Sequence, residues 1–189
     1  MGKIQLETPS LALLPAYVLA LEAGWSPDNI RKEAAAREQL EAIAQAPEAF
    51  VASLDDPTAA GGPIPLPDGT VIPRLPGITR WIFDDHFCGS IGFRWQPGTS
   101  ILPPHVPGHM GFSIVPWKRG NGYAGQALRL MLAEAQGEGL EYVELTVDPE
   151  NLASQKVIAS SGGILVERFR KAAAYGGAEA LRFRIALGD

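Results

Sequence analysis

The sequence predicts an α/β fold built around a central mixed, mostly antiparallel twisted sheet that is flanked by helices. Three observations support this prediction. Residues 10–54 are rich in Ala, Leu, Glu and Gln with helical periodicity, the pattern changes to a period of two from Ile78, and the last third alternates between helix-like and strand-like stretches. The 189 residues, 46% of them apolar, suffice for a single domain over residues 1–189.

The N-terminal part, residues 1–54, is expected to hold two or three helices. NIRKEAAAREQLEAIAQA has helical periodicity, and GWSPD at 24–28 and Pro47 interrupt it. Residues 55–77 form a long Pro/Gly-rich loop, because repeated prolines exclude both helix and central strand. A loop of this length is either a surface excursion or a flap beside a substrate, and the sequence leaves both open.

Residues 78–189 supply the core sheet. TRWIFDD and CGSIGFRW predict a hairpin that turns near residues 84–87, and GHMGFSIV predicts a third strand. A helix is expected over 124–136, because Ala127, Leu128 and Met131 share one face. YVELTVD then predicts a strand, residues 152–160 a shorter helix, and ILVERFR and LRFRIAL two final strands.

Composition narrows the function. A net charge of −5 does not favour a nucleic-acid partner, whereas an acidic surface suits a cationic one such as an amine. Cys88 is the only cysteine, so no internal disulfide is expected, and it fits a buried strand position. The run LALLPAYVLAL is too short to span a membrane, so we expect no membrane partner and a cytoplasmic protein.

The stretch VPWKRGNGYAGQAL, residues 115–128, joins a strand to a helix through a glycine-rich turn. Free backbone N–H groups and the positive end of the helix dipole make such a turn a pyrophosphate site. Its GxGxxG pattern also fits a dinucleotide loop, with Asp148 as the acidic residue of the next strand. However, four residues separate the strand from Gly120, and the chain ends in two strands rather than in further βα units.

A second register fits better. Arg119, Gly122 and Ala124 match [Q/R]-x-x-G-x-[G/A], and DPENLASQKVIASSGG follows at a matching distance, so that residues 111–163 resemble the GNAT superfamily of acetyltransferases. The resemblance implies the GNAT fold, with strands 112–115 and 143–147 splayed around the pantetheine arm of acetyl-CoA. The cofactor-binding residues it implies are Ile114, Val115, Arg119, Gly120, Asn121, Gly122, Tyr123, Ala124, Asn151 and Ser154.

Acetyl transfer to an amine requires removal of a proton. The resemblance implies a base on the strand before the loop, where His109 stands, although His109 could also simply cap a turn. The position of the family's usual tyrosine acid is Ile158, and Tyr175 is the candidate replacement, with an exposed loop tip as its alternative. No metal is expected, because Pro107 lies between His105 and His109 and prevents a helical ligand pair.

The expected function is therefore an acetyl-CoA-dependent N-acetyltransferase that acts by direct transfer on a primary amine of a small molecule or peptide. The alternatives are a noncatalytic acyl-CoA sensor on the same fold and an NAD(P)-dependent oxidoreductase. Trp25 and Trp95 are expected in the core rather than as ligand platforms, and Glu141 or Glu144 could hold a cationic amine. Members of the family are often dimers, so a homodimer is one expectation.

Overall fold

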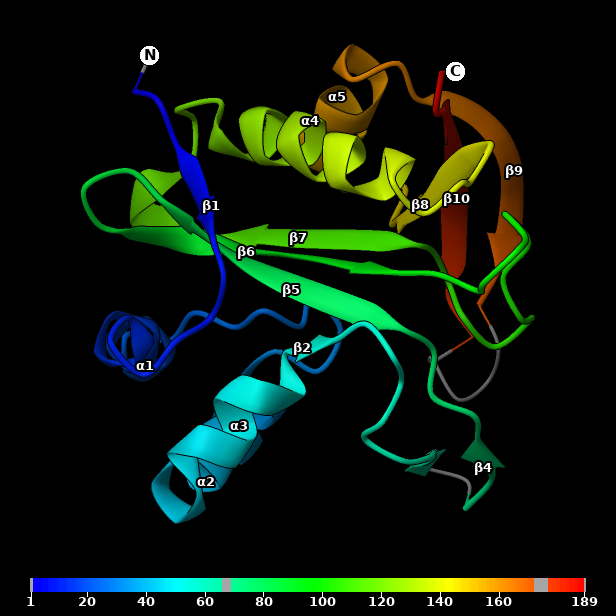
Figure 1. Ribbon diagram of the computed structural model, residues 1–189. Coiled ribbons are helices and arrows are strands. Elements are labelled where there is room, and N and C mark those ends of the chain that lie inside the picture. Colours follow the sequence, from blue (N-terminus) through cyan, green and yellow to red (C-terminus); the bar gives the residue numbers. More distant parts are fainter. Residues whose placement is uncertain (1, 66–68, 172–176, 189) are drawn as a thin grey trace.

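The computed structural model describes residues 2–65, 69–171 and 177–188. A central sheet has helices on both faces, and a second, smaller sheet stands at one end (Figure 1). The expected α/β architecture is confirmed. The helices are α1 (Leu14–Glu22), α2 (Glu33–Gln45), α3 (Pro47–Ser53), the short 3-10 helix η1 (Pro116–Lys118), α4 (Tyr123–Gln136) and α5 (Leu152–Ser160).

The larger sheet runs in the order β1–β5–β6–β7, and β2 also pairs with β5. All of these pairings are antiparallel. Its strands are β1 (Gln5–Glu7), β2 (Asp55–Asp56), β5 (Gly77–Phe83), β6 (Phe87–Arg94) and β7 (Met110–Ile114). The predicted hairpin is therefore present as β5 and β6. Strand β1 was not predicted, because three residues are too few to display alternation.

The smaller sheet has the order β8–β10–β9, again antiparallel. Its strands are β8 (Tyr142–Val147), β9 (Ile164–Arg170) and β10 (Glu179–Ala186). Strands β7 and β8 belong to different sheets, so the sheet is interrupted between them. This interruption is the splayed opening that the resemblance implied.

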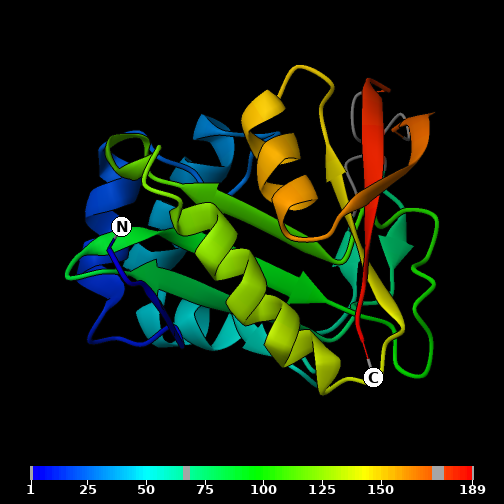
Figure 2. The same ribbon diagram turned by 90° about the horizontal axis from the view of Figure 1, so that it is seen from above.

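The two faces of the larger sheet carry separate apolar clusters. Helix α4 runs across one face and α5 lies next to it (Figure 2), whereas α1 to α3 lie on the opposite face. Alternation along β5 sends Ile82 to the α4 side and Trp81 to the α1 side. Tyr17 of α1 stacks on Trp81 with ring centroids 4.8 Å apart. Trp25 and Trp95 are both buried, as expected.

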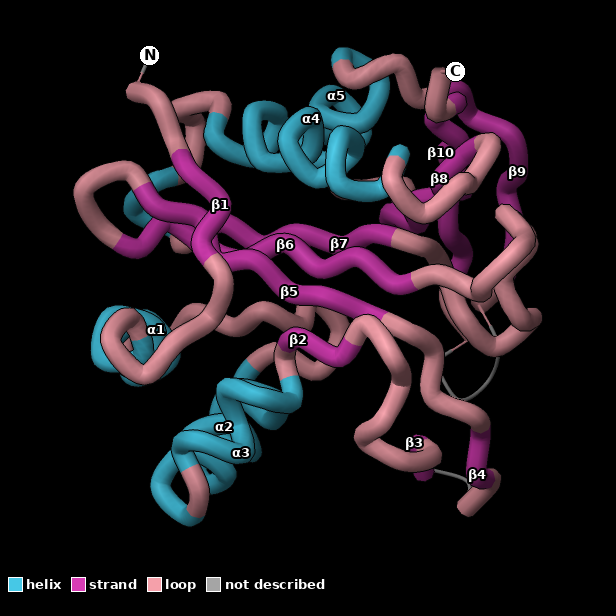
Figure 3. The backbone as a smooth tube through the Cα atoms, in the orientation of Figure 1, coloured by secondary structure: helices cyan, strands magenta, loops and turns pink. Residues whose placement is uncertain are grey.

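The proline-rich segment forms no helix in its described part and holds only two-residue strands (Figure 3). These strands are β2 and the pair β3 (Ile64–Pro65) and β4 (Val71–Ile72). Because β2 pairs with β5, the segment is fastened to the edge of the larger sheet at its start.

Candidate active site

One recess of the structure is a cleft of about 440 Å³ where β7 and β8 diverge. It is surrounded by the two diverging strands, the N-terminal end of α5, the loop between α1 and α2, and residues of β5 and β6. Its lining includes Met110 and Phe112 of β7, Leu145 and Val147 of β8, Asn151, Ser154 and Ile158 at α5, and Asp28 to Ile30 of the loop. Segments far apart in the sequence thus form one elongated site.

Strand β7 presents one backbone edge to β6 and the other edge away from it. His109 O accepts from Arg94 N, and Val115 N donates to Cys88 O, so these two residues are paired with β6. Alternation turns Phe112 and Ile114 the other way. Accordingly, Phe112 O accepts from Asn29 Nδ2 at 3.2 Å and Ile114 O accepts from Arg119 Nε at 3.1 Å.

The backbone N–H groups of two predicted cofactor-binding residues, Ile114 and Val115, point in opposite directions. The N–H groups of Phe112 and Ile114 lie on the open edge, where they can meet a ligand carbonyl. The Val115 N–H cannot do so, because Cys88 O already accepts it at 3.0 Å. Val115 is also completely buried. Of the two expected cofactor-binding residues Ile114 and Val115, only Ile114 therefore has a backbone N–H that lies on the open edge.

His109 occupies the junction at which the two sheets touch. Its N–H donates to Glu144 O at 2.7 Å, and its Nδ1 accepts the Glu144 N–H at 2.9 Å. Because Nδ1 is an acceptor, the neutral ring carries its hydrogen on Nε2, which is buried and has no partner among the described residues. Burial, reinforced by the charges of Arg94 and Arg184, lowers the pKa of His109 to about 4.

The position of His109 differs from that expected of a general base. Its side chain is fully buried, and it is absent from the residues that line the cleft. A base must reach the proton that it removes, directly or through one water. The sequence correctly put His109 next to the strand, but its ring points into the junction between the sheets. A short strand leaves this register undetermined, since a shift of one residue reverses the side-chain face.

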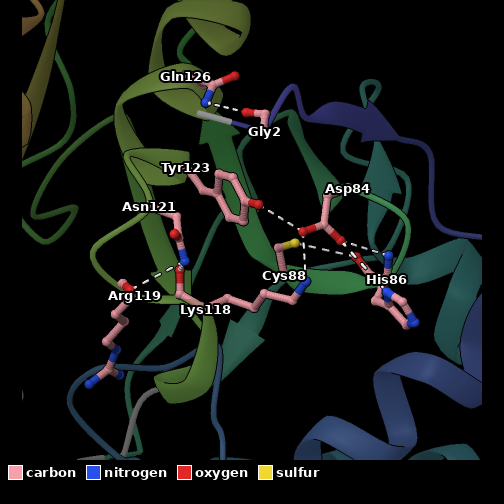
Figure 4. A network of polar contacts seen from close by, with 9 residues as sticks. All are labelled: Gly2, Asp84, His86, Cys88, Lys118, Arg119, Asn121, Tyr123 and Gln126. Atoms are coloured by element: carbon pink, nitrogen blue, oxygen red, sulfur yellow. Dashed lines mark hydrogen bonds and ion pairs between the residues drawn. The ribbon is translucent and has the colours of Figure 1, made fainter.

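The glycine-rich turn leads from η1 into α4. Gly120 and Gly122 have φ angles of 80° and 74°, and Gly122 is the N-cap of α4. No side chain caps this helix, so the N–H groups of its first turn are available to an anion. Asn121 Nδ2 donates to Lys118 O at 3.1 Å and thereby stabilises the turn (Figure 4).

The side chains of Arg119 and Tyr123, two further predicted residues of the turn, make different contacts. The Arg119 side chain extends away from the Tyr123 ring (Figure 4). Its Nε donates to Ile114 O at 3.1 Å. The Tyr123 side chain is buried and donates to Asp84 at 2.8 Å, so only its backbone N–H faces the anion position. Residues 119–124 are thus contiguous around the start of α4, as expected.

At α5 the expected Asn-x-x-Ser pattern has a structural cause. Asn151 is the N-cap, and its Oδ1 accepts the Ser154 N–H at 3.0 Å. Both residues line the cleft, together with Ile158, which is 1% exposed. Gly163 N donates back to Ile158 O, so the glycine turn ends α5 against this residue.

Several other candidate residues are accounted for by their contacts. Glu144 is buried, and its carboxylate accepts from Arg184 Nη2 at 2.7 Å, so it is not presented to an amine. Glu141 is exposed beside β8. Cys88 is buried, and burial raises the pKa of its thiol to about 11. Tyr175 lies outside the described residues.

Two negative findings apply to the described part of the chain. It contains no group of three or more His, Cys, Asp or Glu side chains with the spacing of a metal site. Its helices are also all too short or too polar to cross a membrane.

A second cavity of about 320 Å³ adjoins the cleft. Both recesses share four lining residues: Leu54, Thr79, Gly92 and Arg94. The proline-rich segment contributes Asp56, Ile72 and Arg74 to its wall. His105 also lines it, and His105 Nε2 is buried without a partner in the described residues.

Comparison with known proteins agrees with this geometry. Residues 73–164 match the family model described as acetyltransferase (GNAT) domain. No curated protein matches.

Solved structures match over almost the entire chain. RimL, a ribosomal L7/L12 alpha-N-protein acetyltransferase in complex with coenzyme A, is 14% identical, with 100% of this chain and 97% of that chain covered and a TM-score of 0.64. The microcin C7 self-immunity acetyltransferase MccE, in complex with acetyl-CoA and AMP, is 12% identical, with 98% and 93% covered and a TM-score of 0.62.

A third structure is the acetyltransferase that modifies the N-terminal serine of ribosomal protein L7/L12 from Salmonella typhimurium. It is 12% identical, with 100% of this chain and 97% of that chain covered and a TM-score of 0.57. At identities this low the likeness establishes the fold alone. Together with the family model, these structures confirm the expected resemblance to GNAT acetyltransferases.

Proposed function

We propose, from the premise that the chain has the GNAT fold and matches the GNAT acetyltransferase model over residues 73–164, that it transfers an acetyl group from acetyl-CoA to a primary amine of a small molecule or peptide. The observation that carries the proposal is that the open edge of β7 and the start of α4 are close together along the chain. The free edge of β7 leads within a few residues to the uncapped start of α4, so a carbonyl-binding edge and a pyrophosphate site follow one another directly along the chain.

In the proposed complex, the pyrophosphate lies against the backbone N–H groups of residues 120–124, with Arg119 and Asn121 at the side. The pantetheine arm occupies the cleft between β7 and β8, beside Asn151 and Ser154. Its amide groups pair with the open edge of β7, as an added strand would. The Ile114 N–H then donates to the thioester oxygen, which becomes negative in the transition state. The coenzyme A complex of RimL and the acetyl-CoA complex of MccE support this assignment.

The proposed reaction is direct. The amine nitrogen attacks the thioester carbonyl, the C–N bond forms, the C–S bond breaks and the thiolate leaves. The described part of the chain offers no cysteine nucleophile in the cleft, because its one cysteine, Cys88, is buried with a raised pKa. A covalent acetyl-enzyme is therefore not proposed.

The proton of the amine needs a separate account. His109 is sealed in the sheet junction, and Ile158 replaces the tyrosine expected from the resemblance. We propose that the ammonium group loses one proton to water before attack. The nitrogen becomes cationic as the C–N bond forms, and its second proton passes through water to the leaving thiolate. His109 then has a structural role. Tyr175 stays a prediction, since it lies outside the described residues.

The acceptor is proposed to extend from the cleft into the adjoining cavity. Apolar side chains such as Leu54 and Ile72 form part of its wall, which suits an apolar body. His105 Nε2, which has no partner in the described residues, favours a hydrogen-bond acceptor such as a carboxylate or carbonyl group on that body, and Arg94 lines the same cavity. The part of the proline-rich segment that lines this cavity would thus be a substrate-side wall.

The test of this function combines binding with turnover. Acetyl-CoA should raise the melting temperature more than NAD or NADP does, and free thiol should be released with members of an amine panel that includes amino acids, peptides and polyamines. Stabilisation by NAD or NADP alone would reject the proposal in favour of an oxidoreductase. Binding of acetyl-CoA without thiol release from any amine would favour the noncatalytic sensor.

Three expectations stay predictions with their own measurements. The single domain predicts one cooperative unfolding transition. The homodimer predicts twice the chain mass in sedimentation equilibrium. The cytoplasmic location requires fractionation of cells that produce the protein.

A further inference from the structure

Asp84 contacts the glycine-rich turn from a distant part of the chain. It lies in the turn between β5 and β6, and its Oδ2 accepts from Lys118 Nζ at 2.6 Å and from Tyr123 Oη at 2.8 Å (Figure 4). Its Oδ1 accepts the His86 N–H at 2.8 Å. One carboxylate therefore holds two side chains that lie 34 and 39 residues further along the chain.

The two donors stand on either side of the segment that would contact the pyrophosphate. Lys118 is the last residue of η1 and Tyr123 the first residue of α4, and residues 119–122 lie between them. This segment contains Gly120 and Gly122 in left-handed conformations, and no side chain caps α4. Glycine gives the backbone additional freedom that an anion site must restrict. The hydrogen bonds that Lys118 and Tyr123 donate to Asp84 restrict the conformation of residues 119–122 and occupy none of the backbone N–H groups of this segment.

The carboxylate also changes the electrostatics of the turn. Burial opposes ionisation of Asp84, but hydrogen bonds from Lys118, the His86 N–H and Tyr123 outweigh it and hold its pKa far below the usual range. Asp84 is thus ionised at neutral pH and compensates the charge of Lys118. Lys118 is directed at Asp84, so it supplies little net positive charge to a neighbouring phosphate.

We propose that Asp84 is a positioning residue that fixes the two ends of the turn, through Lys118 and Tyr123, so that the backbone N–H groups of residues 120–124 are held ready for a pyrophosphate. The inference rests on the proposed use of acetyl-CoA. Asp84 lies outside the sequence motif of the turn, so the motif alone does not indicate this role. Asp84 makes no contact with the cofactor in this proposal.

Charge and geometry predict opposite effects for the variant Asp84→Asn. If charge dominates, removal of a carboxylate beside Lys118 strengthens binding of an anionic cofactor. If positioning dominates, the variant loses the carboxylate contacts that hold Lys118 and Tyr123, and binding of the anionic cofactor weakens. Asp85→Asn is the matched control, because it removes the same charge one residue away. Asp85 is exposed and makes no side-chain hydrogen bond or ion pair within the described part of the chain.

Isothermal titration with coenzyme A and with pantetheine, which lacks the pyrophosphate, tests the inference. We expect Asp84→Asn to weaken coenzyme A binding about tenfold and Tyr123→Phe, which removes one hydrogen bond and no charge, about threefold to fivefold. Pantetheine binding should change in neither variant, and Asp85→Asn should match the parent for both ligands. Because Gly2 O accepts from Gln126 Nε2 next to this turn, any affinity tag belongs at the C-terminus.

Each outcome decides the inference. Unchanged or tighter coenzyme A binding by folded Asp84→Asn overturns it, as does equal weakening for pantetheine, which would indicate a general loss of structure. Where Asp84→Asn does not fold, Tyr123→Phe decides alone, and coenzyme A binding equal to the parent overturns the inference. A parent protein that binds pantetheine and coenzyme A equally rejects the pyrophosphate site itself, and one that binds neither rejects the proposed function.

Discussion

His109 Nδ1 accepts the backbone N–H of Glu144 at 2.9 Å, while the His109 N–H donates to Glu144 O at 2.7 Å. An imidazole nitrogen thus takes the place of a carbonyl in a contact that joins β8 to the residue before β7. Residues on either side of His109, Gly108 and Met110, line the cleft. His109 thus contributes both its backbone and its ring to the junction between the two sheets.

The pH dependence of stability tests the structural role of His109. Its pKa is about 4 in the folded protein and about 6.5 in an unfolded chain, so the unfolded state binds more protons between these values. The stabilisation is fully present above pH 6.5 and is lost as the pH falls toward 4. In urea unfolding we expect His109→Asn to abolish up to about 3 kcal/mol of this pH-dependent loss.

The control for that measurement is His86→Asn, because the side chain of His86 is 79% exposed. This variant should keep the pH dependence of the parent between pH 4 and 6.5. An identical pH dependence in His109→Asn and the parent would contradict the assignment of a buried neutral His109.

The pH dependence of turnover tests whether His109 also acts as a base. If the amine loses its proton to water, log kcat/KM rises with unit slope up to the pKa of the amine itself, about 10.4 for a lysine-like acceptor. His109→Asn should shift the level of this profile but leave its shape unchanged. A plateau well below the amine pKa that is present in the parent and absent from the variant would instead support a catalytic His109.

The loop between α1 and α2 is attached to β7 by Ser113. Trp25 Nε1 donates to Ser113 Oγ at 2.9 Å, and Ser113 Oγ donates to Ser26 O at 2.8 Å. We expect Ser113→Ala to lower the free energy of unfolding by about 1–3 kcal/mol, because it leaves a buried indole N–H without an acceptor. Ser160→Ala, which removes only a local contact to Val157 O on an exposed helix, should change it by less than about 0.5 kcal/mol in urea unfolding. Equal effects of the two variants would disprove the anchoring role.

Arg94 tests the proposed extension of the acceptor site, since it lines both recesses. With an acceptor that carries a carboxylate, Arg94→Met should raise the KM for the acceptor about tenfold or more and leave the KM for acetyl-CoA unchanged. Arg37→Met, on the exposed surface of α2, is the control and should alter neither constant. If Arg94→Met leaves the acceptor KM unchanged for every active amine, the adjoining cavity is not part of the acceptor site.

Local patterns in the sequence were sufficient for the second half of the fold. The helix expected over 124–136 begins one residue earlier, at Tyr123, and the helix over 152–160 has the predicted bounds. Both have clear signals, a glycine turn before α4 and the Asn151 cap before α5. The two- and three-residue strands lack such signals, because hydrogen bonds to β5 define β1 and β2.

The site was predictable only where it is contiguous in sequence. The turn at residues 119–124 and the Asn151 cap follow from local patterns. The contact of Asp84 with Lys118 and Tyr123 joins residues more than thirty positions apart, and no spacing rule indicates it. The orientation of His109 depended on the register of β7, and the adjoining cavity depended on how the proline-rich segment folds against β5.

The central claim is that the cleft between β7 and β8, together with the turn before α4, holds acetyl-CoA. Amide hydrogen exchange with and without coenzyme A tests it most directly, because free edge N–H groups become protected when a ligand pairs with them. We predict slower exchange for the amides of Phe112 and Ile114 and for those of residues 120–124, with little change in β9. Protection elsewhere, or none at saturating coenzyme A, would contradict the account.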